Sequence, residues 1–481
     1  MKIIDRILIV FFLLIFVVSL SSAQKIRTPY FAGSFYPGDT VELISYIENV
    51  FKKAPAIKVD GEIVGAITPH AGYQYSGQVA GDMYKQLKGK KFDVVCIVAP
   101  SHRELFRGVS VFSGDAYKTP LGIIEVDKKL ARGIAKECDV ASLSMNGHRA
   151  EHSIEVQLPF LQMALGNFRL IPLVMGDQNY NTCKSLGKTL GKILKGKNAL
   201  VIASSDLSHY HNYDDAVKID KVLIGTLKTY DYLMLMRNFE TGKCEACGGG
   251  PIVAVMIAAQ LLGANKAQVI KYANSGDVSG DKSKVVGYVS SLLVKSDKIQ
   301  SKLGEKDRKK LIEIAKKSVY NKIKGKKTPN FKVTSEVLSR KCGAFVTLNE
   351  NGRLRGCIGY IVAEKPLYKA VEEVAISAAL HDPRFPPVSK SELDKLEFEI
   401  SVLTPFKLIN DINQIEVGKH GLFIVKGNNQ GILLPQVAVS NGWDRETFLK
   451  QVCIKAGLPP DAWKDKKADI YVFSAEVFGE H

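Results

Sequence analysis

Five short apolar runs, separated by segments long enough to hold helices, constrain the fold of this 481-residue chain more than any other feature. Each run has the length of a strand that is buried on both faces of a sheet, and the intervening segments have the length of crossover helices. The alternation predicts an α/β domain with a central, largely parallel sheet over residues 24–295. The predicted strands are residues 63–67, 94–99, 170–174, 200–203 and 285–293, and residues 151–165 are one of the predicted helices.

The pattern changes after a basic linker at residues 296–305. Residues 306–481 begin with a helical pattern and continue with alternating strands and tight turns. Asn351 and Gly352 join two apolar runs and both tolerate positive φ, which predicts a β-hairpin. A second hairpin is expected in GLFIVKGNNQGILLPQVA, and LEFEISVL alternates as a half-buried strand. These features predict a second, smaller α+β domain.

The first 23 residues have the pattern of a secretory signal. Lys2 and Arg6 precede an uncharged stretch at residues 7–20, and small residues at 21–23 suit a signal peptidase. We therefore expect an exported protein, periplasmic or otherwise extracytoplasmic. The alternative is a membrane anchor formed by residues 7–20, although so short an apolar run spans a bilayer poorly.

The formal charge of +17 is concentrated in one part of the chain. Much of the excess lies in residues 298–327, which include KDRKK, AKK and KIKGKK. No recognition helix, zinc finger or aromatic-rich basic sheet motif accompanies these lysines. We therefore interpret them as a solvated linker and helix face, and we expect no nucleic-acid partner.

Six of the nine histidines lie between residues 70 and 211, and three of them follow predicted strands. His70, His102 and His209 come shortly after the runs at 63–67, 94–99 and 200–203. Because the carboxyl ends of parallel strands share one edge of a sheet, these imidazoles are expected to converge there. Neutral imidazoles that converge are suited to bind iron, copper, zinc or nickel. Their spacing matches no zinc signature, so the metal stays open.

Cys247 precedes three glycines and an apolar helix that begins with proline, in CEACGGGPIVAVMIAAQLL. Backbone amides and the helix dipole at such a position favour a thiolate, the form that ligates metals. Cys244 and Cys247 also form a C-x-x-C pair, so a disulfide is an open alternative in an oxidising compartment.

A further histidine lies in EHSIE at the start of the predicted helix 151–165. His152 and Glu155 are three residues apart and would share one helix face, where they could orient a ligand or carry a proton. The other interpretation, a first helical turn enriched in acidic residues, has about equal weight.

Across residues 28–295 the motifs TPHAGYQYSG, APSH, KTPLG, EHSIEVQLPFL, SSDLSHY and CGGGPI occur in this order. In this combination the chain resembles the Memo family, which shares its fold with the class III extradiol dioxygenases. Those enzymes hold nonhaem iron with two histidines and a carboxylate. The resemblance implies that His70, His102 and Cys247 are metal ligands and that Asp206 and His209 line the same pocket. Cys247 stands where the dioxygenases have the carboxylate, which puts ring cleavage in doubt.

Over about residues 305–481 the motifs LNENGRLRGCIGYI, AISAALHDPRFPPV and FEISVLTP resemble the AMMECR family. Memo and AMMECR proteins occur with a radical SAM enzyme in the AmmeMemoRadiSam system, which the resemblance implies as a partner. Cys357 with the loop of His381, Asp382 and Arg384 could form a nucleophilic pair. A small buried thiol beside a structural turn is the favoured interpretation.

These observations lead to one main expectation and one alternative. The main one is a mononuclear metal protein holding Fe(II) or Cu through His70, His102 and Cys247, with redox or dioxygenase-like activity on a small molecule or a protein side chain. His209, with Asp206 as its orienting partner, and His152 are the expected catalytic acid–base residues. The alternative is a module that carries metal or binds a partner without turnover.

Overall fold

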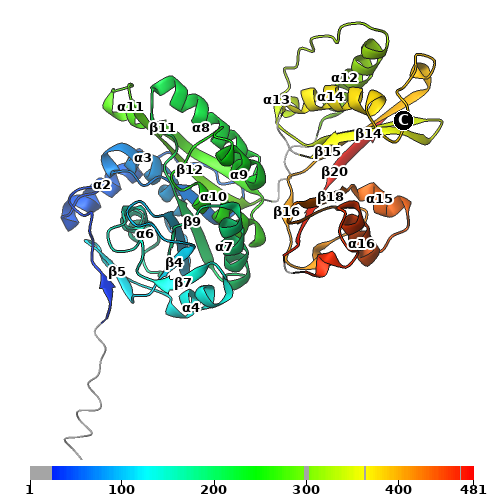
Figure 1. Cartoon of the computed structure of the whole chain (residues 1–481). Helices are drawn as coiled ribbons and strands as arrows, with labels where there is room; N and C mark the ends of the chain where they lie inside the picture. Colours follow the sequence, from blue (N-terminus) through cyan, green and yellow to red (C-terminus); the bar gives the residue numbers. More distant parts are fainter. Residues whose placement is uncertain (1–23, 297–302, 362–364, 466, 481) are drawn as a thin grey trace, which may run out of the picture.

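The computed structural model describes residues 24–296, 303–361, 365–465 and 467–480 (Figure 1). Within these residues the first domain is built on a mixed nine-stranded sheet. Its strands, in sheet order, are β10 (His209–His211), β12 (Val285–Lys295), β2 (Glu62–Thr68), β9 (Ala199–Ser204), β3 (Val94–Pro100), β8 (Arg169–Met175), β4 (Val109–Phe112) and β7 (Ala141–Ser144), and β11 (Lys266–Asn274) pairs with β12. A small separate sheet contains β1 (Ile26–Arg27), β5 (Ala116–Thr119) and β6 (Gly122–Glu125).

The four central strands β2, β9, β3 and β8 are parallel, as the apolar runs predict. They are buried along nearly their whole length, which explains why their sequences do not alternate. The predicted strand at 285–293 is β12, but it runs antiparallel to β2 and extends the sheet on one side. On the other side β4 is antiparallel to β8. The predicted α/β class is confirmed, with antiparallel strands flanking a parallel centre.

Helices cover the sheet on both sides. Figure 1 shows α7, α9 and α10 on one side, and α2, α3 and α6 on the other. Every residue of α10 from Gly249 to Gln260 is buried, which accounts for its uniformly apolar sequence. The helices of this domain are α2 (Thr40–Lys53), α3 (Tyr73–Tyr84), α4 (Lys128–Glu137), α5 (His152–Glu155), α6 (Leu158–Leu165), α7 (Tyr180–Ile193), α8 (Tyr213–Lys228), α9 (Tyr232–Glu240), α10 (Gly249–Leu261) and α11 (Ser275–Ser279).

The predicted helix at 151–165 is wrong in one respect, because it is two helices, α5 and α6. Pro159 lies in the first turn of α6 and has no amide hydrogen to donate to the carbonyl of Glu155. The side chain of Gln157, at the junction, instead donates to the carbonyl of Pro69 at 2.9 Å and to Ser204 Oγ at 2.9 Å. The break therefore ties the single turn of α5 to the ends of β2 and β9.

The second domain has two antiparallel sheets with helices, which confirms the predicted α+β class. One sheet has the order β14-β13-β15-β20 and the other β16-β19-β17-β18. Asn351 and Gly352 have φ of 52° and 72°, as the predicted turn between β13 and β14 requires. The elements are α12 (Glu305–Ile323), α13 (Glu336–Ser339), β13 (Ala344–Glu350), β14 (Arg353–Tyr360), α14 (Leu367–Leu380), β15 (Leu396–Leu403), β16 (Lys407–Leu408), β17 (Gly421–Lys426), β18 (Asn429–Leu433), α15 (Pro435–Ser440), α16 (Arg445–Lys455), β19 (Asp469–Phe473) and β20 (Ala475–Gly479).

The second domain contacts α7 of the first through β19. The hydroxyls of Tyr180 and Tyr471 are 2.7 Å apart. Lys184 and Lys188 both reach the buried carboxylate of Asp469, at 2.6 and 3.0 Å. These contacts join two units that the sequence shows only as separate patterns.

The predicted signal peptide or anchor at residues 1–23 lies outside the described residues, as does most of the basic linker, residues 297–302. Among the residues that the structure describes, no helix has the length and apolar character needed to cross a membrane.

Candidate metal centre

Two imidazoles and a thiol meet at the carboxyl edge of the central sheet. His70 and His102 each lie two residues after a strand, β2 and β3 respectively, and Cys247 directly precedes Gly248, the N-cap of α10. One potential ligand atom from each of the three residues lies within 4.8 Å of the other two. The Sγ atom of Cys247 is 3.1 Å from Nε2 of His70. The structure thus brings together the three residues that the sequence analysis named as ligands.

The hydrogen bonds around His70 determine which of its nitrogens is free. Its Nδ1 lies 2.9 Å from Ser204 Oγ, whose own hydrogen is donated to the carbonyl of Ser153 at 2.6 Å. Ser204 Oγ must therefore accept from Nδ1–H of His70, which leaves the Nε2 lone pair directed at Cys247. Burial, followed by the nearby charge of His102, holds the pKa of His70 well below its usual value. The imidazole is neutral and ready to ligate a metal.

Glu151 has the same effect on His102. Its Oε1 is 2.9 Å from Nδ1 of His102, and its Oε2 accepts the backbone amide of His102 at 2.7 Å. Burial acts to raise the pKa of Glu151, but the hydrogen bonds from His102 outweigh it and lower the pKa to about 2. The carboxylate therefore takes Nδ1–H and leaves Nε2 of His102 for a metal. No role of Glu151 was predicted from the sequence, although its position directly before His152 was a signal for one.

Cys247 is held by contacts on both sides of the glycine-rich turn. The backbone amide of Asp206 donates to Sγ at 3.2 Å. The side chain of Gln178 donates to the carbonyl of Cys247 and accepts from the amide of Gly250, both at 2.8 Å. Burial, followed by the charge of Asp206, raises the pKa of the Cys247 thiol above its usual value. Burial therefore opposes the thiolate that the amides at the start of α10 favour, and a metal would have to displace the thiol proton.

The cysteines show no disulfide. All eight lie within the described residues and all are free, including Cys244 and Cys247. The disulfide alternative for this pair is therefore not the arrangement of this structure, where Cys244 is buried and only Cys247 belongs to the metal-ligating group.

The three residues predicted to be catalytic have different surroundings. The His152 ring centroid is 4.6 Å from that of His102 and 5.2 Å from that of His70. Asp206 is buried, which raises its pKa, and its Oδ1 accepts the amide of His70 at 2.8 Å. His209 is half-buried, and its Nδ1 lies 2.8 Å from the carbonyl of Leu207. His209 is thus oriented by donating a hydrogen bond to the carbonyl of Leu207, and Asp206 instead holds the backbone of His70.

Glu155 does not share the site with His152. Its carboxylate forms a buried ion pair with Arg27 and accepts hydrogen bonds from the amide of Phe31 and the hydroxyl of Tyr36. Because α5 is only one helical turn, each of its side chains contacts the segment that it happens to face. Glu155 anchors the start of the domain, while His152 faces the other two imidazoles.

In the second domain the surroundings of Cys357 are those of a structural turn. Its backbone amide donates to Asp382 at 2.8 Å, and Arg384 donates to its carbonyl at 3.2 Å. Burial raises the pKa of its thiol. A Cβ on Gly356 would lie 2.1 Å from the carbonyl oxygen of Ala378, so this glycine permits close packing of α14. These contacts favour a structural thiol over a nucleophile, although Cys357 is half-buried rather than buried.

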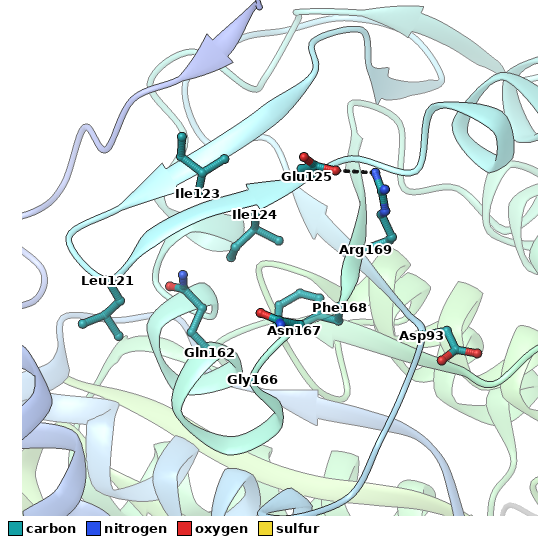
Figure 2. A pocket seen from close by; sticks show the side chains of 10 residues that line it. All are labelled: Asp93, Leu121, Ile123, Ile124, Glu125, Gln162, Gly166, Asn167, Phe168 and Arg169. Atoms are coloured by element: carbon teal, nitrogen blue, oxygen red, sulfur yellow. Dashed lines mark ion pairs between the residues drawn. The ribbon is translucent and has the colours of Figure 1, made fainter.

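A cavity of about 620 Å³ lies away from the metal centre (Figure 2). It is under the β5–β6 hairpin, beside the start of β8, and Glu125 and Arg169 form an ion pair of 2.6 Å at its rim. The start of β8 is at the opposite edge of the sheet from His70 and His102. The lining of the cavity contains no histidine or cysteine, so the cavity has none of the metal-ligating groups of the candidate site.

The fold and site together define an α/β protein with a candidate mononuclear metal centre of two imidazoles and a thiol. Residues 27–292 match the family model described as Memo-like protein, and residues 312–478 match the model described as AMMECR1. The chain belongs to the Memo family, with an AMMECR1 domain fused at its C-terminal end.

Relatives from archaea match part of this chain. A MEMO1 family protein of Methanopyrus kandleri is 38% identical over 276 residues, which are 55% of this chain and 97% of that protein. One of Methanothermobacter thermautotrophicus is 38% identical over 272 residues, 55% of this chain and 98% of that protein. A crystal structure of an uncharacterized protein from Pyrococcus horikoshii is 44% identical and covers 36% of this chain and 90% of its own, with a TM-score of 0.35.

Proposed function

We propose that the first domain binds a single iron or copper ion through His70, His102 and Cys247 and uses it for redox or oxygen-dependent chemistry. The observation that carries the proposal is the convergence of the three donor atoms within 4.8 Å. The Nδ1 atoms of both histidines are already taken by Ser204 and Glu151, so both Nε2 atoms are left for a metal. A preformed donor set of this kind fits a metal better than it fits a packed core.

Imidazole and thiolate are ligands that iron and copper accept, and such an ion supplies electron transfer or oxygen binding. The chain itself supplies a proton acceptor beside the site. Because Nδ1–H of His209 is committed to the carbonyl of Leu207, its Nε2 lone pair is the atom that accepts a proton from a substrate. Asp206 keeps His70 in place through the backbone hydrogen bond at 2.8 Å.

Metal analysis of purified protein tests this proposal. Wild type is expected to retain about one iron or copper per chain, and the double variant His70→Ala, His102→Ala almost none, because two of the three ligands are lost. His211→Ala is the matched control, since His211 pairs with Glu245 and is not one of the candidate ligands. Equal metal content in wild type and the double variant would end the proposal.

A second candidate function is metal carriage or partner binding without turnover. It is favoured because the third donor of the site is a thiol and not a carboxylate. The nearby carboxylate of Glu151 is hydrogen-bonded to His102. Sustained metal-dependent oxygen consumption with a panel of catechols or thiols would exclude carriage alone. No oxygen uptake by metal-loaded protein would favour it.

The cellular setting of the site is also proposed. The family pair supports a pathway shared with a radical SAM enzyme, and residues 1–23 support export. A fusion of these residues to a periplasmic reporter tests export: reporter activity outside the cytoplasm supports it, and its absence contradicts it. Co-purification of the radical SAM enzyme with the full chain tests the partnership.

A further inference from the structure

Three imidazole rings, rather than two, surround the candidate metal position. The centroid distances are 5.0 Å between His70 and His102, 5.2 Å between His70 and His152, and 4.6 Å between His102 and His152. We propose that His152 is a third imidazole ligand of the ion and that Glu151 positions it together with His102. This inference rests on the proposed metal-binding function.

The ring spacing is the first argument. A metal–nitrogen bond of about 2.0–2.1 Å places the centre of an imidazole about 3.2 Å from the ion. Rings at tetrahedral or octahedral angles around one ion then have centres about 4.6–5.3 Å apart. All three observed distances between ring centroids lie within this range. Ordinary ring packing gives similar distances, as between Phe35 and His152 at 4.7 Å, so the spacing permits coordination and the hydrogen bonding must distinguish the two.

The hydrogen bonding of His152 is the second argument. Its Nδ1 is buried and makes no hydrogen bond, although it lies 3.2 Å from Oε1 of Glu151. The same oxygen is 2.9 Å from Nδ1 of His102. A buried polar nitrogen without a partner is costly, and a small rotation of the ring toward Glu151 would complete its hydrogen bond. One carboxylate would then hold Nδ1–H of both rings. Because the close ligand-atom group of His70, His102 and Cys247 does not include His152 in its present position, the same rotation must also bring its Nε2 toward the ion.

The packing around His152 is the third argument. Phe31 and Phe35 lie against the ring, with centroids 5.5 and 4.7 Å away, and only 14% of the side chain is exposed. These contacts restrict the ring to a position beside His70 and His102. They leave it little freedom to carry protons to and from solvent. The inference therefore assigns His152 to the metal, in place of the proton transfer expected from the sequence.

Binding of Co(II), a spectroscopic probe, to the full chain tests this inference. His152→Ala is expected to bind Co(II) about 10- to 100-fold more weakly than wild type, with a changed visible d–d spectrum because one nitrogen ligand is lost. Glu151→Gln is expected to weaken binding by a similar factor, since the neutral amide has only one accepting oxygen and cannot serve both the rings and the backbone amide of His102. His211→Ala should bind as wild type does. Melting of the metal-free proteins checks that each is folded, and His152→Gln replaces His152→Ala if that variant is not.

Two outcomes separate this inference from the proposed function. If His152→Ala and His152→Gln keep the affinity and the spectrum of wild type while His70→Ala loses them, His152 is not a ligand, but the three-residue site stands. If neither His70→Ala nor the His152 variants change Co(II) binding, both the inference and the proposed function are wrong.

Discussion

Burial keeps several imidazoles of the first domain neutral. His148 shows the effect outside the metal centre: its Nδ1 is 2.8 Å from the hydroxyl of Tyr117, and its Nε2 is 3.2 Å from the carbonyl of Ser110. A neutral ring serves both contacts, with Nε2–H donating and Nδ1 accepting. Burial lowers the pKa of His148 to about 3, so the charged form is strongly disfavoured in the folded chain.

His148 therefore makes stability depend on pH. With a pKa of about 3 in the folded state against 6.5 in the unfolded state, the unfolded chain binds the extra proton, and stability falls as the pH drops below about 6.5. For one such group the loss between pH 7 and pH 5 is about 2 kcal/mol. His148→Gln should lose less stability over this interval than wild type, measured on metal-free protein by denaturant unfolding with circular dichroism. Equal losses in both proteins would contradict this account.

At the residue scale the sequence identifies donors better than their partners. His70, His102 and Cys247 could be named because each lies next to the end of a strand or the start of a helix. Glu151 and Ser204 could not, because their roles depend on which nitrogen of a distant imidazole faces them. The stretch EHSIE illustrates this: Glu151 meets His102, whereas Glu155, four residues on, meets Arg27.

At the scale of elements, the turn before α10 presses on the end of β9. A Cβ on Gly248 would lie 2.5 Å from the carbonyl oxygen of Ser204. Because this oxygen belongs to the backbone, the strand or the turn would have to shift to relieve the clash. The close approach puts Cys247 beside His70, because His70 bonds to Ser204 in turn. The position of the thiol thus follows from the packing of a helix start against a strand end.

Gly248→Ala tests that packing. It should destabilise the protein by about 1–3 kcal/mol through overpacking and also weaken metal binding, because the turn that holds Cys247 must move. The control is Gly225→Ala in α8, where a Cβ meets nothing within 4 Å. Replacing this helical glycine should change stability by no more than about 1 kcal/mol, in the stabilising direction. Unfolding and metal titration of both variants are the measurements, and unaltered metal affinity in Gly248→Ala would contradict the account.

The buried strands of the first domain and the Asn351-Gly352 hairpin of the second could be predicted from their hydrophobic patterns, whereas shorter strands such as β4, β7 and β10 were not identified. The division of 151–165 into α5 and α6 was missed, although Pro159 was a visible signal for it. The antiparallel direction of β12 could not be predicted, because a buried strand has the same apolar sequence in either direction.

At the scale of the whole molecule, the second domain docks on the two helices next to the metal centre. Besides the contacts to α7, Gln260 of α10 accepts the backbone amide of Leu408 at 3.2 Å. The apolar side chains of Phe423 and Tyr471 belong to the same core cluster as the first domain. The sequence predicts two domains, but docking depends on surfaces that only folding creates.

Asp469 is the charged centre of this interface. Asp469→Ala removes the acceptor of both Lys184 and Lys188 and should weaken docking by about 1–3 kcal/mol, because charge-assisted hydrogen bonds are lost. Scanning calorimetry should then show the two domains unfolding further apart in temperature than in wild type. Glu137→Ala removes an exposed pair with Lys192 and should leave the profile nearly unchanged. Identical profiles for wild type and Asp469→Ala would show that this contact does not couple the domains.

The central claim is that His70, His102 and Cys247 hold one metal ion. A crystal structure with anomalous difference maps collected across the iron and copper absorption edges tests it most directly. The account predicts a single strong peak within bonding distance of both imidazoles and the Cys247 sulfur. The height of this peak should rise on crossing either the iron edge or the copper edge. A peak elsewhere, or none in protein shown by metal analysis to contain iron or copper, would contradict it.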